Sequence, residues 1–198
     1  MSYIIAPLDK VKETFPEFRD ALGDLQAAVI KRAEQIWPGF TFGGLTPGQK
    51  QFGLTTILPR EVFGKGTQTW LQNFTAVGSW TNIFSYSVPV DEVHAFGGFA
   101  FTEPTLSFSQ LRWEIGDRKF PIINIEEARS FVNVAGGFAV VVKSDKGKEM
   151  IADERTAVLV KGFQERGTSG IRQRIIPIGL MAFRRVDIVI TEEKTSAA

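Results

Sequence analysis

The amino-acid sequence predicts a mainly β protein, an antiparallel β-sandwich or barrel of about 8–10 strands preceded by one long amphipathic helix. Three observations predict this fold. Apolar residues recur at helical spacing in one long stretch near the N-terminus. After Gly39 the apolar period shortens to that of a strand, in which alternate residues share a face. Short strand-like runs then follow one another, separated by turn sequences and without a second long helix.

The helix is predicted over residues 14–40, "TFPEFRDALGDLQAAVIKRAEQIWPGF". Thr14 and Glu17 fit a capping box, and Pro16 lies in the first turn, where its missing N–H costs nothing. The sequence Trp37-Pro38-Gly39 ends the helix. Its apolar stripe needs an apolar partner, so we take the stripe as a candidate assembly interface. The stripe consists of Phe18, Leu22, Leu25, Val29 and Ile36.

The strands follow the helix directly. They are expected at residues 40–43, 51–58, 68–77, 79–88, 93–101, 105–115, 119–123, 138–144, 155–163, 171–178 and 180–190. Turn sequences such as Thr46-Pro47-Gly48 and Glu103-Pro104 separate them. One short helix is expected in a crossover at residues 125–129.

The chain divides into three predicted parts. Residues 1–39 form an N-terminal arm and the helix, with residues 1–13 irregular. Residues 40–190 form the β-sandwich. Residues 191–198 form a polar tail that is expected to fray.

An aromatic stretch at residues 96–117 raises a question of register. Phe108 and Trp113 fall on opposite parities of one predicted strand. Either a bulge near Ser109-Gln110 turns both rings inward, or the strand is covered on both faces. Gly97-Gly98 would allow another backbone or a ring to approach closely. A core strand pair and the wall of a ligand pocket both fit this stretch.

Composition limits the chemistry. The chain has no cysteine, which excludes disulfide frameworks, thiolate zinc sites and cysteine nucleophiles. One histidine, His94, is a poor basis for a metal site. No Gly-x-Ser-x-Gly elbow or phosphate loop is present, so we expect no enzyme activity and no cofactor or metal. No apolar run approaches the roughly 20 residues of a membrane helix, so no membrane span is expected.

Arginines gather near the C-terminus although the net charge is only +1. Residues 166–185 contain five arginines and no acidic residue. Arginines on one sheet edge could hold the phosphates of a nucleic acid. Alternatively, they form a solvated face, contact another subunit, or form ion pairs with Glu126, Glu127, Asp153 or Glu154. The candidates are Arg172, Arg174, Arg184 and Arg185.

Two segments, "LRWEIGDRKFPIINIEEARSF" at 111–131 and "AVLVKGFQERGTSGIRQRIIP" at 157–177, resemble the late strands of jelly-roll coat proteins from archaeal viruses and bacteriophages. The resemblance extends in style over residues 40–190. It implies a jelly-roll-like sandwich and a non-enzymatic capsid subunit that assembles with copies of itself. Assembly would take place in the host cytoplasm, and the protein would be located in the virion. The resemblance also implies a nucleic-acid genome, met through phosphates, and other virion proteins as partners. The family has no shared active site, so no catalytic residue is carried over.

A second function class stays open, a β-sandwich or barrel that binds a glycan or an apolar ligand. The stretch from Phe96 to Trp113, together with Trp70 and Trp80, favours it because binding sites use the same aromatic lining. An enzyme that uses carboxylates alone ranks last, since no sequence feature supplies a suitably spaced pair.

Overall fold

The computed structural model describes residues 2–7, 16–43, 50–57, 70–73, 78–101, 109–125, 138–143, 145, 149–164 and 172–184. This part of the chain contains one helix, α1 (Pro16–Ile36), and thirteen strands. The strands are β1 (Ser2–Pro7), β2 (Phe40–Thr41), β3 (Lys50–Thr56), β4 (Trp70–Asn73), β5 (Ser79–Ser87), β6 (Glu92–Phe101), β7 (Gln110–Ile115), β8 (Arg118–Lys119), β9 (Ile123–Asn124), β10 (Phe138–Lys143), β11 (Met150–Ala152), β12 (Ala157–Gln164) and β13 (Arg172–Arg184).

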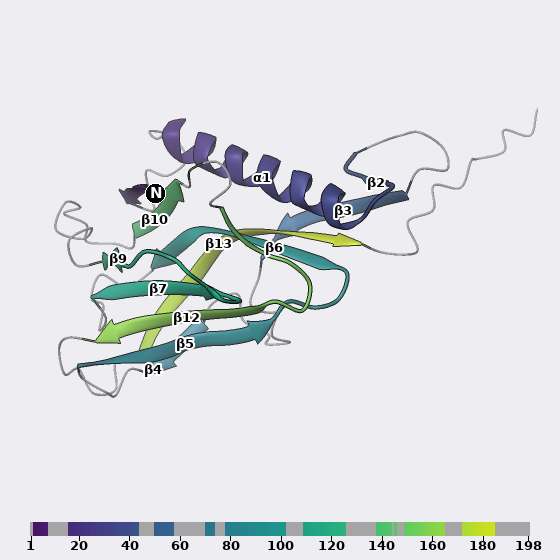
Figure 1. Ribbon diagram of the computed structural model, residues 1–198. Coiled ribbons are helices and arrows are strands. Elements are labelled where there is room, and N and C mark those ends of the chain that lie inside the picture. Colours follow the sequence, from purple (N-terminus) through teal and green to yellow (C-terminus); the bar gives the residue numbers. More distant parts are fainter. Residues whose placement is uncertain are drawn as a thin grey trace, which may run out of the picture.

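The strands form two sheets. The larger has eight strands in the order β1-β10-β6-β13-β3-β2, with β11 also pairing β6 and β4 also pairing β13. The smaller has five strands in the order β5-β12-β7-β8, with β9 also pairing β7. Among the described strands, all pairings are antiparallel except that of β2 with β3, which is parallel. Figure 1 shows three layers, with α1 above the larger sheet and the smaller sheet beneath it.

The strand order is that of a jelly roll. In the larger sheet β3, β13, β6 and β10 are successive neighbours, and in the smaller sheet β5, β12, β7 and β9 are. The first of these eight strands along the chain therefore pairs the last, and the second pairs the second last. This nesting produces the two Greek keys of a jelly roll. The predicted fold class, a mainly β sandwich with one long helix, is confirmed.

The helix lies on the outer face of the larger sheet. Leu25 and Val29 are buried against a cluster that includes Val93 and Ala95 of β6 and Ala182 of β13. The predicted end of the helix is also correct, since α1 stops at Ile36 and the next N–H bonds back into its last turn. The stripe thus has its apolar partner within the chain. No helix in the described ranges is long and apolar enough to cross a membrane.

The main core fills the space between the sheets. In β7, Leu111, Trp113 and Ile115 are buried and alternate with more exposed residues. The Trp113 ring lies 4.4 Å from the Phe96 ring and stacks 4.7 Å from the Phe99 ring, measured between centroids. The expected burial of Trp113 is confirmed, whereas Phe108 and most of the expected helix at 125–129 lie outside the described residues.

The β6 strand is covered on both faces. Its residues from 93 to 100 are all buried, with Phe96 and Phe99 facing the core and Val93 and Ala95 facing α1. The expected close approach at Gly97-Gly98 is confirmed. A Cβ on Gly97 would lie 3.0 Å from Leu25 of the helix, and one on Gly98 would lie 1.9 Å from the Val140 carbonyl oxygen.

Four elements differ from the sequence prediction. Residues 2–7 form strand β1, although this segment was expected to be irregular. Residues 150–152 form β11, where no strand was expected. The strand expected at 119–123 is two short strands, β8 and β9, with no strand at residues 120–122. The expected strands 171–178 and 180–190 are one strand over the described residues 172–184, β13, with a register shift between Ile178 and Gly179 where it pairs with β6.

Pro177 does not break β13 because of where it lies. The strand pairs with β4 up to Ile175 and with β3 from Leu180 onward. Pro177 falls between these two ladders on one edge of the strand, where a missing N–H removes no hydrogen bond to β4 or β3. On the other edge it lies opposite Phe99 of β6, and the pairing continues past it.

Candidate functional site

The described residues bring polar side chains together in four places: inside the sandwich at His94, beside the helix at Arg32, at the Arg184–Asp91 pair, and on the outer face of the smaller sheet. Each is a candidate for binding or chemistry. Within the described part of the chain, no cluster of three or more His, Cys, Asp and Glu side chains could hold a metal ion.

His94 is fully buried at one end of the core and has partners on both ring nitrogens. Its Nε2 lies 2.7 Å from Glu92 Oε2, and its Nδ1 lies 2.7 Å from the Tyr86 hydroxyl. A carboxylate only accepts, so Nε2–H donates to Glu92. The neutral ring then leaves Nδ1 to accept the hydrogen bond that the Tyr86 hydroxyl donates.

The order Glu92, His94, Tyr86 has the form of a proton relay, but the tyrosine is not activated. Burial, and secondly the charge of Glu92, raise the pKa of Tyr86 well above its ordinary value, so its hydroxyl keeps its proton. A nucleophile needs the opposite shift. The arrangement therefore provides hydrogen-bond partners for both nitrogens of a buried imidazole between the two sheets. It does not activate Tyr86 as a nucleophile.

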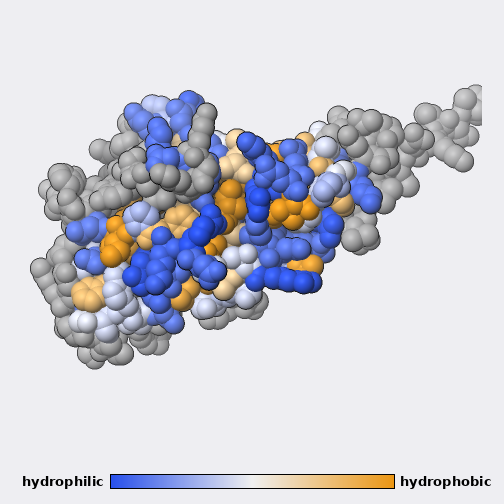
Figure 2. Space-filling view, viewed as in Figure 1, coloured by the Kyte–Doolittle hydropathy of each residue, from blue (hydrophilic) through white to orange (hydrophobic). Residues whose placement is uncertain are grey.

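A groove of about 480 Å³ runs between α1 and the strands β10 and β11. Its apolar side chains include Leu25 and Ala28 of the helix and Val142 and Ile151 of the strands. Its charged side chains are Asp24, Lys31, Arg32, Lys143 and Glu149. Figure 2 shows hydrophobic surface between α1 and the strands beneath it, bordered by hydrophilic residues.

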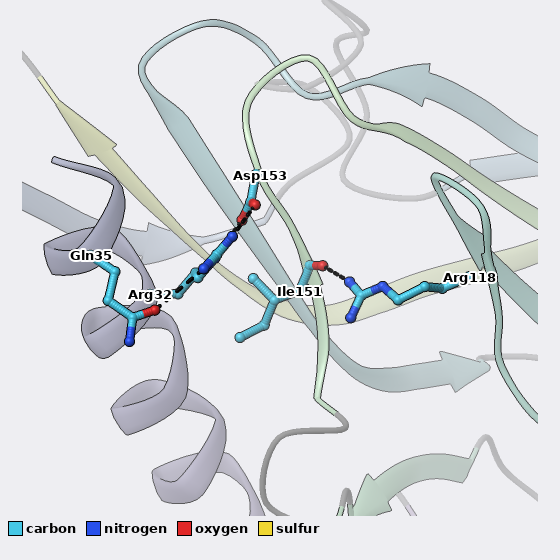
Figure 3. A network of polar contacts seen from close by, with 5 residues as sticks. All are labelled: Arg32, Gln35, Arg118, Ile151 and Asp153. Atoms are coloured by element: carbon cyan, nitrogen blue, oxygen red, sulfur yellow. Dashed lines mark hydrogen bonds and ion pairs between the residues drawn. The ribbon is translucent and has the colours of Figure 1, made fainter.

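Arg32 is already engaged beside this groove. Its Nε lies 3.0 Å from Asp153 Oδ1 and its Nη2 lies 2.5 Å from Oδ2, a bidentate pair that raises the pKa of Arg32 through hydrogen bonding to Asp153. Gln35 accepts a further hydrogen bond at 3.3 Å (Figure 3). Arg118, from the other side, donates to the Ile151 carbonyl oxygen. These contacts attach the helix to the segment after β11 and leave the guanidinium of Arg32 neutralised.

The predicted arginine candidates are only partly described. Arg184 pairs with Asp91, with Nε 2.8 Å from Oδ1, and its guanidinium lies over the rings of Trp37 and Phe40. Arg184 therefore forms an ion pair, which was one of the predicted alternatives, but its partner Asp91 was not among the carboxylates suggested from the sequence. Of the suggested carboxylates, Asp153 is engaged by Arg32 and Glu154 by the Asp91 N–H, while Glu126 and Glu127 lie outside the described residues.

Arg172 and Arg174 lie in β13, two residues apart, at register positions opposite Asn73 and Leu71 of β4. Arg185 lies outside the described residues. The helix stripe is described from Leu22 to Ile36, with Leu25 and Val29 buried and the other two half-buried. For Phe18 the structure gives its place in α1 alone. The assembly role of the stripe stays a prediction.

The outer face of the smaller sheet was missed at the sequence level. Glu114 lies 2.8 Å from Arg112 and 3.2 Å from Lys161, and Arg112 lies 4.7 Å above the Trp80 ring. Burial alone would raise the pKa of Glu114, but the hydrogen bond from Lys161 and the nearby cations lower it overall. Trp80 also contacts the Phe163 ring at 5.5 Å. Alternation in β7 and β12 was the available signal, but it could not show which strands are neighbours.

Comparison with known proteins gives no relative: no family model, no curated protein and no solved structure matches this chain.

Proposed function

We propose that the chain is a non-enzymatic structural protein that assembles with copies of itself, as the coat subunit of a virus particle that encloses nucleic acid. The observation that carries the proposal is the jelly-roll strand order, β3-β13-β6-β10 against β5-β12-β7-β9, with a helix covering one outer face. Jelly rolls recur in viral capsid proteins, lectin domains and cupins, so the fold alone leaves these classes to be separated.

The polar clusters separate them in part. A cupin-type metal centre needs several imidazoles, but this chain has one, and its two nitrogens contact Glu92 and Tyr86. Two of the described cations, Arg32 and Arg184, form ion pairs with carboxylates of the same chain. These features favour a scaffold that presents surfaces to other molecules. In a coat subunit the partners would be further copies, other virion proteins and the phosphates of a genome, and the protein would be located in the virion.

A second candidate, a glycan-binding sandwich, is favoured by one observation. Trp80 is half-buried on the outer face of the smaller sheet, beside Arg112, Glu114 and Phe163. An aromatic ring next to polar groups is a common platform for sugar rings. Trp37 and Trp113 are buried and would not report on such a ligand, so quenching of tryptophan fluorescence by oligosaccharides, lost in Trp80→Phe, would support this candidate.

Native size tests the main proposal. Size-exclusion chromatography with light scattering should find species far heavier than the 22.0 kDa chain, and negative-stain electron microscopy should show closed particles of uniform size. The measurement should cover a range of protein and salt concentrations, because assembly is concentration-dependent and surface charges are screened by salt. A strict monomer under all conditions contradicts the proposal.

A further inference from the structure

The β10 strand is buried on both faces and needs both of its edges paired. Its residues Ala139, Val140, Val141 and Val142 are exposed by 5% or less. Ala139 and Val141 pack towards the helix, while Val140 and Val142 face the core between the sheets. An apolar strand of this kind with an open edge would present unpaired N–H and C=O groups and invite aggregation.

One edge of β10 pairs with β6 and the other with β1. Six register pairs join β1 to β10, from Ser2 opposite Lys143 to Pro7 opposite Phe138. They cover β10 over its whole length. Residues 2–7 therefore serve as a strand added to the edge of the sandwich, and we call them the arm.

The arm depends on this one ladder. It stands at the end of the sheet, and no strand of the described part pairs with its other edge. Among the described elements, β10 is the one with which it makes more than marginal contact. Figure 1 shows the arm and the N-terminus beside β10 at the margin of the molecule, near the start of α1.

The helix has partners of its own in the sandwich. Leu25, Val29 and Ala33 pack on the larger sheet, and Arg32 pairs with Asp153. A fully extended chain spans at most about 3.3–3.6 Å per residue, so the connection from Pro7 to Pro16 allows a separation of up to about 30 Å. This length would let the arm leave its own β10 while α1 keeps its place on the sheet.

We propose that the edge of β10 is an exchange site between two copies of this chain, in which the arm of one copy pairs with β10 of the other. The same register pairs form within or between chains, so exchange needs no new complementarity and costs little. Between chains, each arm also links two molecules. The inference deepens the proposed self-assembly and rests on it for its biological role, but two copies suffice for the exchange itself.

Two single-cysteine variants test this directly, because the natural chain has no cysteine. Ser2→Cys and Lys143→Cys place one thiol at each end of a register pair, and Lys143 is exposed, so neither change should disturb the fold. The two purified variants, one carrying a size tag, are mixed, incubated and oxidised, and covalent heterodimer is measured on a non-reducing gel. We expect about tenfold or more heterodimer than from random collision, because pairing holds the thiols together.

Ser2→Cys mixed with Asp117→Cys gives the collision control, since Asp117 is exposed in a turn of the smaller sheet. The double variant Ser2→Cys/Lys143→Cys should form both intrachain and interchain disulfides. Heterodimer no more abundant than in the control, with the double variant closing solely within one chain, overturns the exchange. Failure of the double variant to cross-link at all overturns the register on which it rests.

The outcomes separate the two proposals. Uniform particles without heterodimer would retain the coat function and overturn the exchange. Heterodimer without any species larger than a dimer would retain the exchange and contradict the coat function.

Discussion

Gly98 shows how one residue sets the spacing between strands. Its φ is +149°, a conformation that side chains with a Cβ rarely adopt, and an added Cβ would collide with the Val140 carbonyl. It lies next to the position where β6 and β13 shift register. The sequence predicted the close approach from the glycine pair, but not which strand makes it, because that depends on the order of strands in the sheet.

Two glycine substitutions should have opposite effects. Gly98→Ala should lower the free energy of unfolding by about 2–4 kcal/mol, because it adds backbone strain and a steric clash. Gly23→Ala, in a helix position with no atom within 4 Å of the added Cβ, should raise it by about 0.5–1 kcal/mol. Urea unfolding followed by circular dichroism measures both, and equal effects would contradict the described environments.

Tyr86 should make stability fall at alkaline pH. Because its pKa is raised in the folded protein, the folded state keeps the proton while the unfolded state loses it above about pH 10. The contribution is therefore complete below that pH and is lost as the pH rises further. Tyr86→Phe should cost about 1 kcal/mol at neutral pH through its lost hydrogen bond to His94, and the difference from the natural chain should shrink above pH 10. Chemical unfolding at pH 8 to 11 checks this, and a constant difference would contradict it.

The polar cluster at His94 marks the limit of sequence reasoning at this scale. Glu92 and His94 are two residues apart in a strand, so their shared face was readable from the sequence. The contact with Tyr86 was not, because β5 belongs to the other sheet and its approach depends on how the two sheets pack.

Among the elements, α1 was the most predictable and its partner the least. Periodicity predicted its stripe and the sequence Trp37-Pro38-Gly39 predicted its end, since both follow from local sequence. It could not say whether the stripe meets the chain's own sandwich or a neighbour. In the structure the stripe meets the chain's own sandwich, because the helix packs closely over small residues of the larger sheet, Ala95, Ala100 and Ala182.

Charge placed on the buried side of the helix should be far more harmful than charge on its exposed side. Leu25 is 6% exposed, so Leu25→Asp should destabilise by about 3–5 kcal/mol through lost packing and an unpaired buried carboxylate. Leu22→Asp should have a smaller effect, since Leu22 is half-buried. Gln26→Asp, at an exposed position, should change stability by about 0.5 kcal/mol or less. Thermal unfolding and particle yield measure the series, and equal losses at all three positions would contradict the stripe.

The strands show why local patterns mislead. Gly179 suggested a break, yet β13 continues because a register shift against β6 accommodates it, and an added Cβ there would lie 2.6 Å from the Ala95 carbonyl oxygen. The strand at residues 2–7 was missed because a short apolar segment forms a strand only when a neighbouring edge is available. Such pairings are decided by the whole fold.

At the scale of the molecule, the sandwich class was readable from many short strands, but the jelly-roll order was an expectation from resemblance. Strand order depends on pairings between residues far apart, such as β3 with β13, that no local period records. The same order leaves the two sheets unlike each other: the larger has α1 on its outer face, while the smaller has the half-buried, mutually paired Arg112, Glu114 and Lys161 on its outer face. A coat subunit of this kind would have two chemically distinct surfaces for its neighbours and its genome.

Substitution of Arg172 and Arg174 tests whether the basic segment binds nucleic acid or contacts a neighbouring subunit. They lie two residues apart in the part of β13 that pairs with β4, in the most basic stretch of the chain. We expect them to meet either phosphate or carboxylates of an adjacent chain. In the double variant Arg172→Gln/Arg174→Gln, phosphate contact predicts weaker nucleic-acid binding with a salt dependence reduced by up to about two charges, and intact particles. Contact with a neighbouring subunit predicts failed assembly instead, because its carboxylates lose their partners. Filter binding over a salt series, read beside particle yield, separates the two results. If neither binding nor assembly changes, the arginines form a solvated face and contribute to neither interaction.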